Sequence, residues 1–253
     1  GNLIPNSQYN FINESTNAFD DNGHGTACAG IIAAIGNNLT GVSGVAPNCK
    51  IINIKSFNSS ASGEWVDIAQ GLIYAWQTGS WICSNSWGSF NSSSIIDNAI
   101  LDGTTLGRNG KGTIYLFAAG NYQSNVIFPA SNPNGIAVGA LSPCNQRKST
   151  VSCDNENWGS CYGTGLSIVA PGVKIFATDI SGNGGYTSGN YISNFNGTSS
   201  ATPNAAGTVA LMLSVDSTLR WDKVREYLSR SADKVGNYNY NSTGPYSSLG
   251  YTW

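Results

Sequence analysis

The sequence is poor in charge and in residues that transfer protons. Of its 253 residues only 10% are charged, and the net charge is -2, with 12 basic and 14 acidic side chains. An average soluble domain carries about 25% charged residues, so Ser, Asn, Thr and Gly must cover much of this surface. Basic residues form no run longer than Arg147-Lys148. Such a chain offers no electrostatic footprint for nucleic acid or anionic lipid, and we expect neither as a partner.

Long apolar runs and metal-binding cysteine motifs are also missing. No stretch approaches 18 consecutive apolar residues, so no membrane-spanning helix is predicted. The six cysteines include no C-x-x-C pair and the chain has one histidine, which excludes a zinc-finger pattern. Cys144, Cys153 and Cys161 lie close together in a stretch rich in Ser, Asn and Gly. A disulfide from Cys144 to Cys153 or to Cys161 is expected, which indicates an extracellular or secreted protein.

Short apolar runs alternate with segments of helical period. This pattern predicts an α/β fold of three layers, with a mostly parallel central sheet and helices on both faces. The expected buried strands are Ile51 to Phe57, Trp81 to Ser84, Thr113 to Ala118 and Ile136 to Leu141. The expected helices are Gly25 to Ile35, Glu64 to Gln77, Ile95 to Leu106, Ser199 to Leu213 and Ser217 to Ser231, the last with Ser217 as N-cap. No linker interrupts the chain, so we expect residues 1–253 to form a single domain. We also expect the protein to be a monomer.

Three short segments carry residues suited to acyl transfer. His24 is the only imidazole and therefore the only candidate general base. Ser199 follows a glycine turn at the start of a helix of small residues, where the helix dipole favours a developing oxyanion. Asn121 follows a buried strand, a position from which its amide could face the same oxyanion. Read singly, each segment has a plain structural explanation as a core histidine, a helix cap or a turn.

Taken together, the segments resemble the subtilisin-like serine proteases, the subtilases. The matching motifs occur in the family's order: His24-Gly25-Thr26, Gly-Val-Ala-Pro at 44–47, Ser86-Trp87-Gly88, Ala-Ala-Gly-Asn at 118–121, Ala-Pro-Gly at 170–172 and Gly-Thr-Ser-x-Ala-Thr-Pro at 197–203. The resemblance implies a serine endopeptidase acting on polypeptides, with His24 as base, Ser199 as nucleophile and Asn121 as oxyanion donor. It also implies that Ser86, Trp87, Gly88, Ala119 and Gly120 bind the substrate.

The resemblance implies a structural calcium site as well. In the loop Asn37-Asn38-Leu39-Thr40-Gly41-Val42, the ligands would be the Asn38 amide and the backbone carbonyls of Thr40 and Val42. The residues around Ser86 carry no acid, so a preference for basic substrates is not supported. The pocket that receives the first substrate side chain, the first specificity pocket, is expected to be apolar or of medium size, as indicated by Trp87, Tyr122 and Ile127.

The chain departs from the family at the third member of its triad, an Asp that precedes the histidine motif on a strand. Residues 1–19 contain no Asp, and Glu14 lies in a polar stretch. Asp20 and Asp21 belong to the histidine motif, where the family has acids without a triad role. We expect a domain truncated at both ends, folding poorly and cleaving slowly, since loss of the triad Asp in subtilisin lowers kcat by about 3 × 10⁴.

Two other readings of the sequence remain. A degenerate subtilase fold could serve as a binding domain without catalysis. A papain-like cysteine protease would use Cys161, but that family places its Cys before its His, and the Ser199 motif would then have no explanation. Cys28 resembles the thiol that some subtilases carry after the histidine, and it reads more simply as a small buried side chain.

Overall fold

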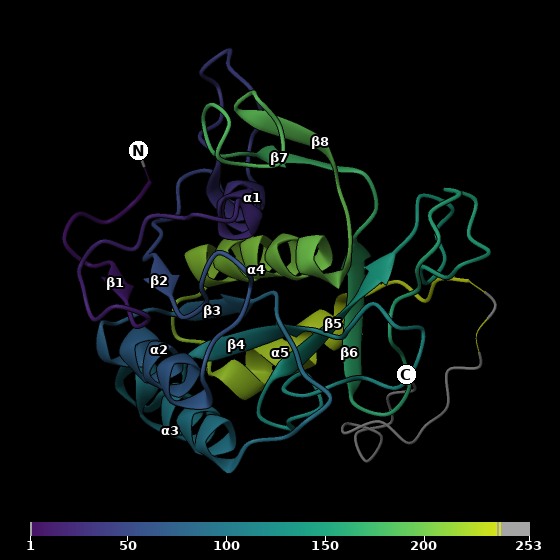
Figure 1. Cartoon of the computed structure of the whole chain (residues 1–253). Helices are drawn as coiled ribbons and strands as arrows, with labels where there is room; N and C mark the ends of the chain where they lie inside the picture. The colour runs from purple at the N-terminus through teal and green to yellow at the C-terminus, as the bar shows by residue number, and fades with distance from the viewer. Residues whose placement is uncertain (1, 237, 239–253) are drawn as a thin grey trace.

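A computed structural model describes residues 2–236 and 238 of the chain, and a parallel sheet lies at its centre (Figure 1). The strands occur in the order β3 (Ile82–Asn85), β4 (Ile114–Ala118), β5 (Ile136–Leu141) and β6 (Leu166–Pro171). All three neighbouring pairs are parallel. The sheet is therefore built by crossover connections, as the alternating sequence pattern predicts.

Helices cover both faces of this sheet, and the side chains of β4 show why. Successive strand residues point to opposite faces. Ile114 and Leu116 pack with α4 (Thr198–Val215) and α5 (Trp221–Ser231). Tyr115 and Phe117 pack with α2 (Trp65–Gln77) and α3 (Ser94–Gly110). Both faces of β4 are fully buried, so its sequence is continuously apolar, and the expected three-layer α/β fold is confirmed.

A second, smaller parallel pair stands apart from the central sheet. It consists of β1 (Tyr9–Asn10) and β2 (Ile54–Lys55). The sequence predicts a longer strand, from Ile51 to Phe57, and no strand before it. The observed strand is shorter because its only described neighbour is the two-residue β1, although Ile51 adds an isolated bridge to Leu3.

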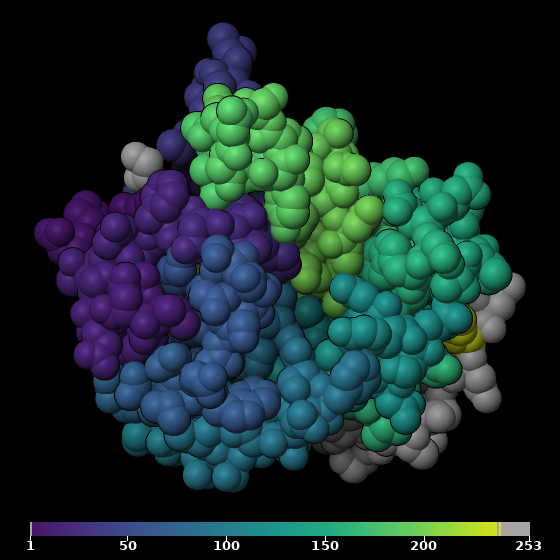
Figure 2. Space-filling model, in the orientation of Figure 1, coloured from purple at the N-terminus to yellow at the C-terminus, as the bar shows by residue number. Residues whose placement is uncertain are grey.

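The remaining elements lie beside α4. Helix α1 (His24–Ala33) packs on α4 and on β7 (Ile175–Thr178), which forms an antiparallel pair with β8 (Tyr191–Phe195). Figure 2 shows that the purple and blue N-terminal segments, the teal middle segments and the green β7–β8 region meet around a recess on this face. No helix in the described ranges is long and apolar enough to cross a membrane.

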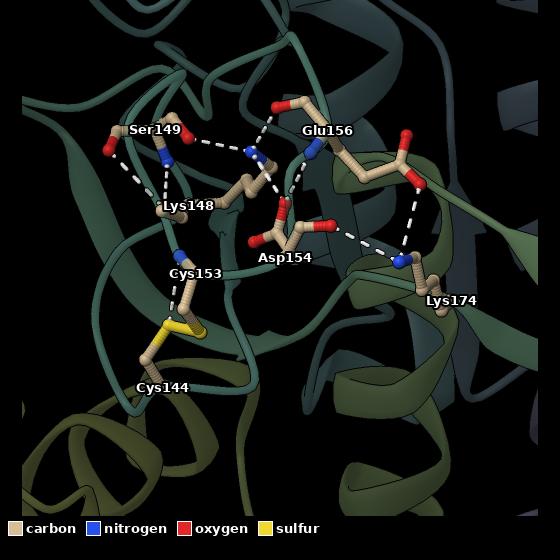
Figure 3. The surroundings of a disulfide bond; sticks show 8 residues. Cys144, Lys148, Ser149, Cys153, Asp154, Glu156 and Lys174 are labelled. Carbon is tan, nitrogen blue, oxygen red and sulfur yellow. Dashed lines mark hydrogen bonds and ion pairs between the residues drawn. A yellow bond between two sulfur atoms is a disulfide. The ribbon is translucent and has the colours of Figure 1, made fainter.

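Two local expectations are resolved by the loops. Cys144 pairs with Cys153, the first of the two predicted disulfides (Figure 3). Cys161 is buried with a free thiol. Ser217 is not the N-cap of the last helix, which begins at Trp221 after Arg220. The reason is a turn fixed by Asp216, whose carboxylate accepts hydrogen bonds from the backbone and hydroxyl of Thr218. The predicted truncation at residues 250–253 lies outside the described residues.

Candidate active site

Ser199 lies in the first turn of α4, and a proline shapes its surroundings. Gly197 precedes the helix with a φ of 111°, a conformation that favours glycine. Pro203 has no N–H, so the carbonyl of Ser199, four residues earlier, lacks its helical partner. The hydroxyl of Ser86 donates to that carbonyl at 2.8 Å, and the Cys28 thiol donates to it at 3.5 Å. The freed carbonyl thus joins α4 to the end of β3 and to α1.

The Ser199 hydroxyl itself is half-buried and faces the segment after β3. It donates to the backbone carbonyl of Ser86 at 3.3 Å. Among the described residues, no hydrogen bond joins Ser199 to His24. Hydrogen bonds between a nucleophile and its base are often long or poorly aligned before substrate binds.

Asn121 is held by the residue that precedes the serine. Its Oδ1 accepts a hydrogen bond from the backbone N–H of Thr198 at 2.8 Å and from the Thr198 hydroxyl at 2.9 Å. The same hydroxyl accepts from the N–H of Gly120 at 3.2 Å. Because two donors fix Oδ1, the amide NH₂ of Asn121 is directed to the opposite side and is available to an incoming oxygen. A Cβ on residue 197 would lie only 3.1 Å from that Nδ2, which explains the glycine there.

His24 begins α1 and faces a thiol rather than a carboxylate. Its Nδ1 lies 3.9 Å from the sulfur of Cys28, one helical turn further on, and its ring meets Phe195 edge to face at 5.4 Å. Burial lowers the pKa of His24, and the Asp20 carboxylate opposes this in part. Burial raises the pKa of Cys28 to about 12. The thiol is therefore neutral and the imidazole is the group that can accept a proton near neutral pH.

The acids of the histidine motif have structural partners. Asp20 accepts four hydrogen bonds, from the backbone N–H groups of Asn22, Gly23 and Thr26 and from the Thr26 hydroxyl. Burial alone would raise the pKa of Asp20, but these bonds outweigh it and hold the pKa below its usual value. Asp21 forms an ion pair with Lys55 at 2.6 Å. Both acids hold the turn before α1, in keeping with the interpretation of the motif.

The predicted substrate-binding segments follow neighbouring strands. Ser86, Trp87 and Gly88 follow β3, and Ala119 and Gly120 follow β4, so both leave the sheet at the same edge. The Trp87 ring packs against Phe57 and Phe117, with centroids 5.6 and 6.0 Å apart. The ring therefore belongs to the apolar cluster that α2 and α3 cover.

The loop predicted to bind calcium is exposed and offers only uncharged donors. The Asn38 amide oxygen accepts the N–H of Thr40 at 3.1 Å, and the Asn38 carbonyl accepts the Thr40 hydroxyl at 3.2 Å. Nowhere in residues 2–236 and 238 do three or more His, Cys, Asp or Glu side chains form a group that could hold a metal. Calcium favours carboxylates, so these residues do not fit a calcium site well.

Thr198 and Pro203 contribute to the site without a role predicted from the sequence, and Cys28, which the sequence analysis noted after the histidine, contributes as well. Thr198 orients Asn121, Cys28 contacts both His24 and the Ser199 carbonyl, and Pro203 leaves that carbonyl free. Pro203 is the one signal visible in the sequence, since a proline six residues into a helix must release a carbonyl.

Comparison with protein families matches residues 3–251 to Peptidase S8, the subtilase family. The chain belongs to the subtilases. Alkaline elastase YaB from Bacillus sp. (strain YaB) is a subtilase relative with 39% identity, over 92% of this chain and 56% of that protein. Subtilisin Savinase from Lederbergia lenta is 36% identical, over 92% of this chain and 79% of the other. The chain thus spans little more than half the length of several relatives.

Two further comparisons bear on the fold and on metals. A crystal structure of a cold adapted subtilisin-like serine proteinase superposes with a TM-score of 0.73 and 27% identity, covering 94% of this chain and 78% of that chain. Another relative is named calcium-dependent protease and comes from Nostoc sp. (strain PCC 7120 / SAG 25.82 / UTEX 2576). It is 37% identical to this chain over 90% of this chain and 38% of the relative.

Proposed function

We propose that the chain is a serine endopeptidase that hydrolyses peptide bonds through an acyl-enzyme on Ser199. The observation that carries the proposal is the pairing of Asn121 with Thr198, the residue before the serine. It sets a fixed side-chain amide beside the N-terminal turn of α4, where an oxyanion would be stabilised. Membership of the subtilase family and relatives named as proteases support it.

The proposed reaction uses three residues in turn. Ser199 Oγ attacks the substrate carbonyl carbon while His24 accepts the hydroxyl proton. The Asn121 amide and the backbone N–H of Ser199 donate to the oxygen as it gains negative charge. His24 then gives its proton to the leaving amine, and water hydrolyses the resulting ester by the same steps in reverse. The low pKa of His24 keeps the base neutral and ready at neutral pH.

A fluorophosphonate probe tests this function directly, because it reacts only with an activated serine. We expect a stoichiometric adduct on the peptide that contains Ser199, located by mass spectrometry. Ser199→Ala abolishes the adduct, and Ser193→Ala, an exposed serine on β8, is the matched control and retains it. If the native chain forms no adduct at every pH tested from 6 to 10, the result would favour the alternative, a subtilase fold that binds without catalysis.

Calcium binding at Asn38, Thr40 and Val42 stays a prediction from the sequence. Its support is the resemblance and a relative named calcium-dependent, and the uncharged donors of the loop weigh against it. Titration of the chain with Ca²⁺ by calorimetry, compared with Asn38→Ala, measures the affinity. Equal heats for the two proteins remove this loop as the site.

We also propose a secreted monomer of one domain that acts on polypeptides. The disulfide between Cys144 and Cys153 and the low charge support an extracellular setting. The single domain is supported by α4, which packs against α1 and against strands β3 to β6. Size-exclusion chromatography with light scattering measures the oligomeric state.

A further inference from the structure

One side chain fills the space between the two segments that border the proposed substrate. A Cβ built on Gly88 would lie 2.8 Å from Cδ1 of Ile127, and a Cβ built on Gly120 would lie 3.1 Å from the same atom. The end of Ile127 therefore contacts both the segment after β3 and the segment after β4. The resemblance to the subtilases implies that the segment after β3 forms one side of the pocket for the substrate side chain on the acyl side of the cleaved bond, so Ile127 lies at that pocket.

Ile127 is anchored on both sides. Its backbone N–H donates to the carbonyl of Ala119 at 3.1 Å. The next residue, Phe128, accepts a hydrogen bond from the N–H of Ser89 at 2.7 Å. Ile127 therefore cannot leave the space by a simple shift of its backbone, because each flanking contact ties it to one of the two segments.

Other side chains also lie close to the two glycines. Behind Gly120 lies the buried sulfur of Cys161, 2.9 Å from where a Cβ would stand. Beyond the glycines, the exposed rings of Phe90 and Tyr122 meet with centroids 4.7 Å apart and join the two segments. A hollow of about 390 Å³ borders Phe90 and Ile127, but neither Gly88 nor Gly120 lines it. A substrate side chain that enters between the two segments would therefore meet Cδ1 of Ile127.

We propose that Ile127 restricts the residue on the acyl side of the cleaved bond to small uncharged side chains, such as those of Ala and Ser. This inference rests on the proposed function. A Phe or Leu side chain there would have to displace Ile127, whereas a methyl group fits against it. Differences of one or a few methylenes in an apolar pocket change specificity about 10–200-fold. The sequence predicted an apolar pocket of medium size, and the position of Ile127 makes it smaller.

The test compares two peptidyl diphenyl phosphonates that carry Ala-Ala-Pro followed by an alanine or a phenylalanine analogue. Mass spectrometry follows the rate of Ser199 modification. We expect the native chain to react at least about tenfold faster with the alanine reagent. Ile127→Ala moves this ratio at least tenfold towards phenylalanine, and Ile127→Val moves it in the same direction by less. Ile95→Ala, a partly exposed residue in the first turn of α3, leaves the ratio unchanged.

A small fluorophosphonate, which has no peptide side chain, separates the two proposals. If it labels Ser199 while the phenylalanine reagent reacts as fast as the alanine reagent, the proposed function stands and the role of Ile127 is wrong. If it labels nothing, the function fails, and calorimetry with uncleaved peptides and Ser199→Ala decides the role of Ile127. Tighter binding of the alanine peptide, lost in Ser199→Ala/Ile127→Ala, supports the role, and equal or absent binding overturns it.

Discussion

Thr198 shows how one side chain can place two functional groups. Its hydroxyl donates to Asn121 Oδ1 and accepts from the N–H of Gly120, and its own N–H also donates to Asn121. The amide of Asn121 cannot rotate without losing two hydrogen bonds. A preorganised donor of this kind stabilises charge without reorganisation during the reaction.

Removal of the Asn121 amide is expected to slow acylation without unfolding the chain. Loss of one oxyanion donor costs about 10²–10³ in rate in enzymes of this kind. We expect Asn121→Ala to lower the rate of Ser199 modification by that factor, as followed by mass spectrometry. Asn125→Ala, on an exposed part of the same loop, is the control and reacts at the native rate. A normal rate in Asn121→Ala would show that another group stabilises the oxyanion.

The pH dependence of acylation reports the environment of His24. Burial lowers the pKa of this imidazole, so the proposed base becomes neutral at a lower pH than an exposed histidine with a pKa of about 6.5. We therefore expect the acid limb of the rate profile to have its midpoint below 6.5. Asp20→Asn removes the charge that raises the pKa, and it should move the midpoint further down. An unchanged or higher midpoint in Asp20→Asn would contradict this electrostatic description.

At the scale of elements, the loop from residue 142 to 165 supports the segment that carries Asn121. Lys148 donates its backbone N–H to Ala140 of β5 and accepts from Ser160. One residue further, Cys161 donates its backbone N–H to Gly120. The loop is closed by the Cys144–Cys153 disulfide, and a buried Lys148–Asp154 ion pair lies inside it (Figure 3). Disturbance of this loop can therefore reach Asn121, the proposed oxyanion donor, through the backbone.

The buried ion pair gives a sharp test of that support. Lys148 is fully buried and donates to Asp154 at 3.0 Å and to the carbonyls of Ser149 and Glu156 at 2.6 and 2.7 Å. Lys148→Met leaves the Asp154 charge buried without its partner, so unfolding in urea should show a loss of about 3–5 kcal/mol. Lys148→Met/Asp154→Leu should recover most of it.

The control for this prediction is an exposed ion pair. Arg220 and Asp222 lie 3.2 Å apart on the surface, with more than a third of each side chain accessible. Arg220→Met should cost less than about 1 kcal/mol. Equal losses in Lys148→Met and Arg220→Met would show that burial of the Lys148 pair has no special effect on stability.

For the whole molecule, the sheet could be predicted from the sequence more fully than the site. The strand Ile136–Leu141 has the predicted bounds, because buried parallel strands are apolar along their whole length. The strands β7 and β8 lie within a stretch of Gly, Ser and Asn that could be assigned only as strands with long loops. The hydrogen bonds between Thr198 and Asn121 join residues that are 77 positions apart, and no local sequence pattern predicts such a contact.

Acid is expected to destabilise the whole fold through buried carboxylates. Burial alone would raise the pKa values of Asp154 and Asp179, but hydrogen bonds outweigh it and hold both below their usual range. At these two groups the unfolded chain binds protons more readily than the folded one. Their contribution to stability is therefore complete above about pH 5 and is lost as pH falls through the lowered pKa values. The low pKa of His24 acts in the same direction below about pH 6.5.

Thermal unfolding between pH 2.5 and 7 measures this dependence. In Asp179→Asn the decrease of Tm with falling pH should be smaller than in the native chain, because one of the carboxylates that lose hydrogen bonds on protonation is gone. Asp102→Asn, an exposed residue on α3, should follow the native curve. A Tm that rises on acidification would contradict the assignment.

The central place of α4 has a consequence for synthesis of the protein. This helix, Thr198–Val215, contains no charged residue, packs against α1 and strands β3 to β6, and supplies both Ser199 and the residue that orients Asn121. A nascent chain released from the ribosome as far as β6 would hold His24 and Asn121 but no nucleophile and no support for the amide. The proposed reaction can therefore begin only after α4 has been translated, because chains that stop before this helix lack Ser199 and Thr198.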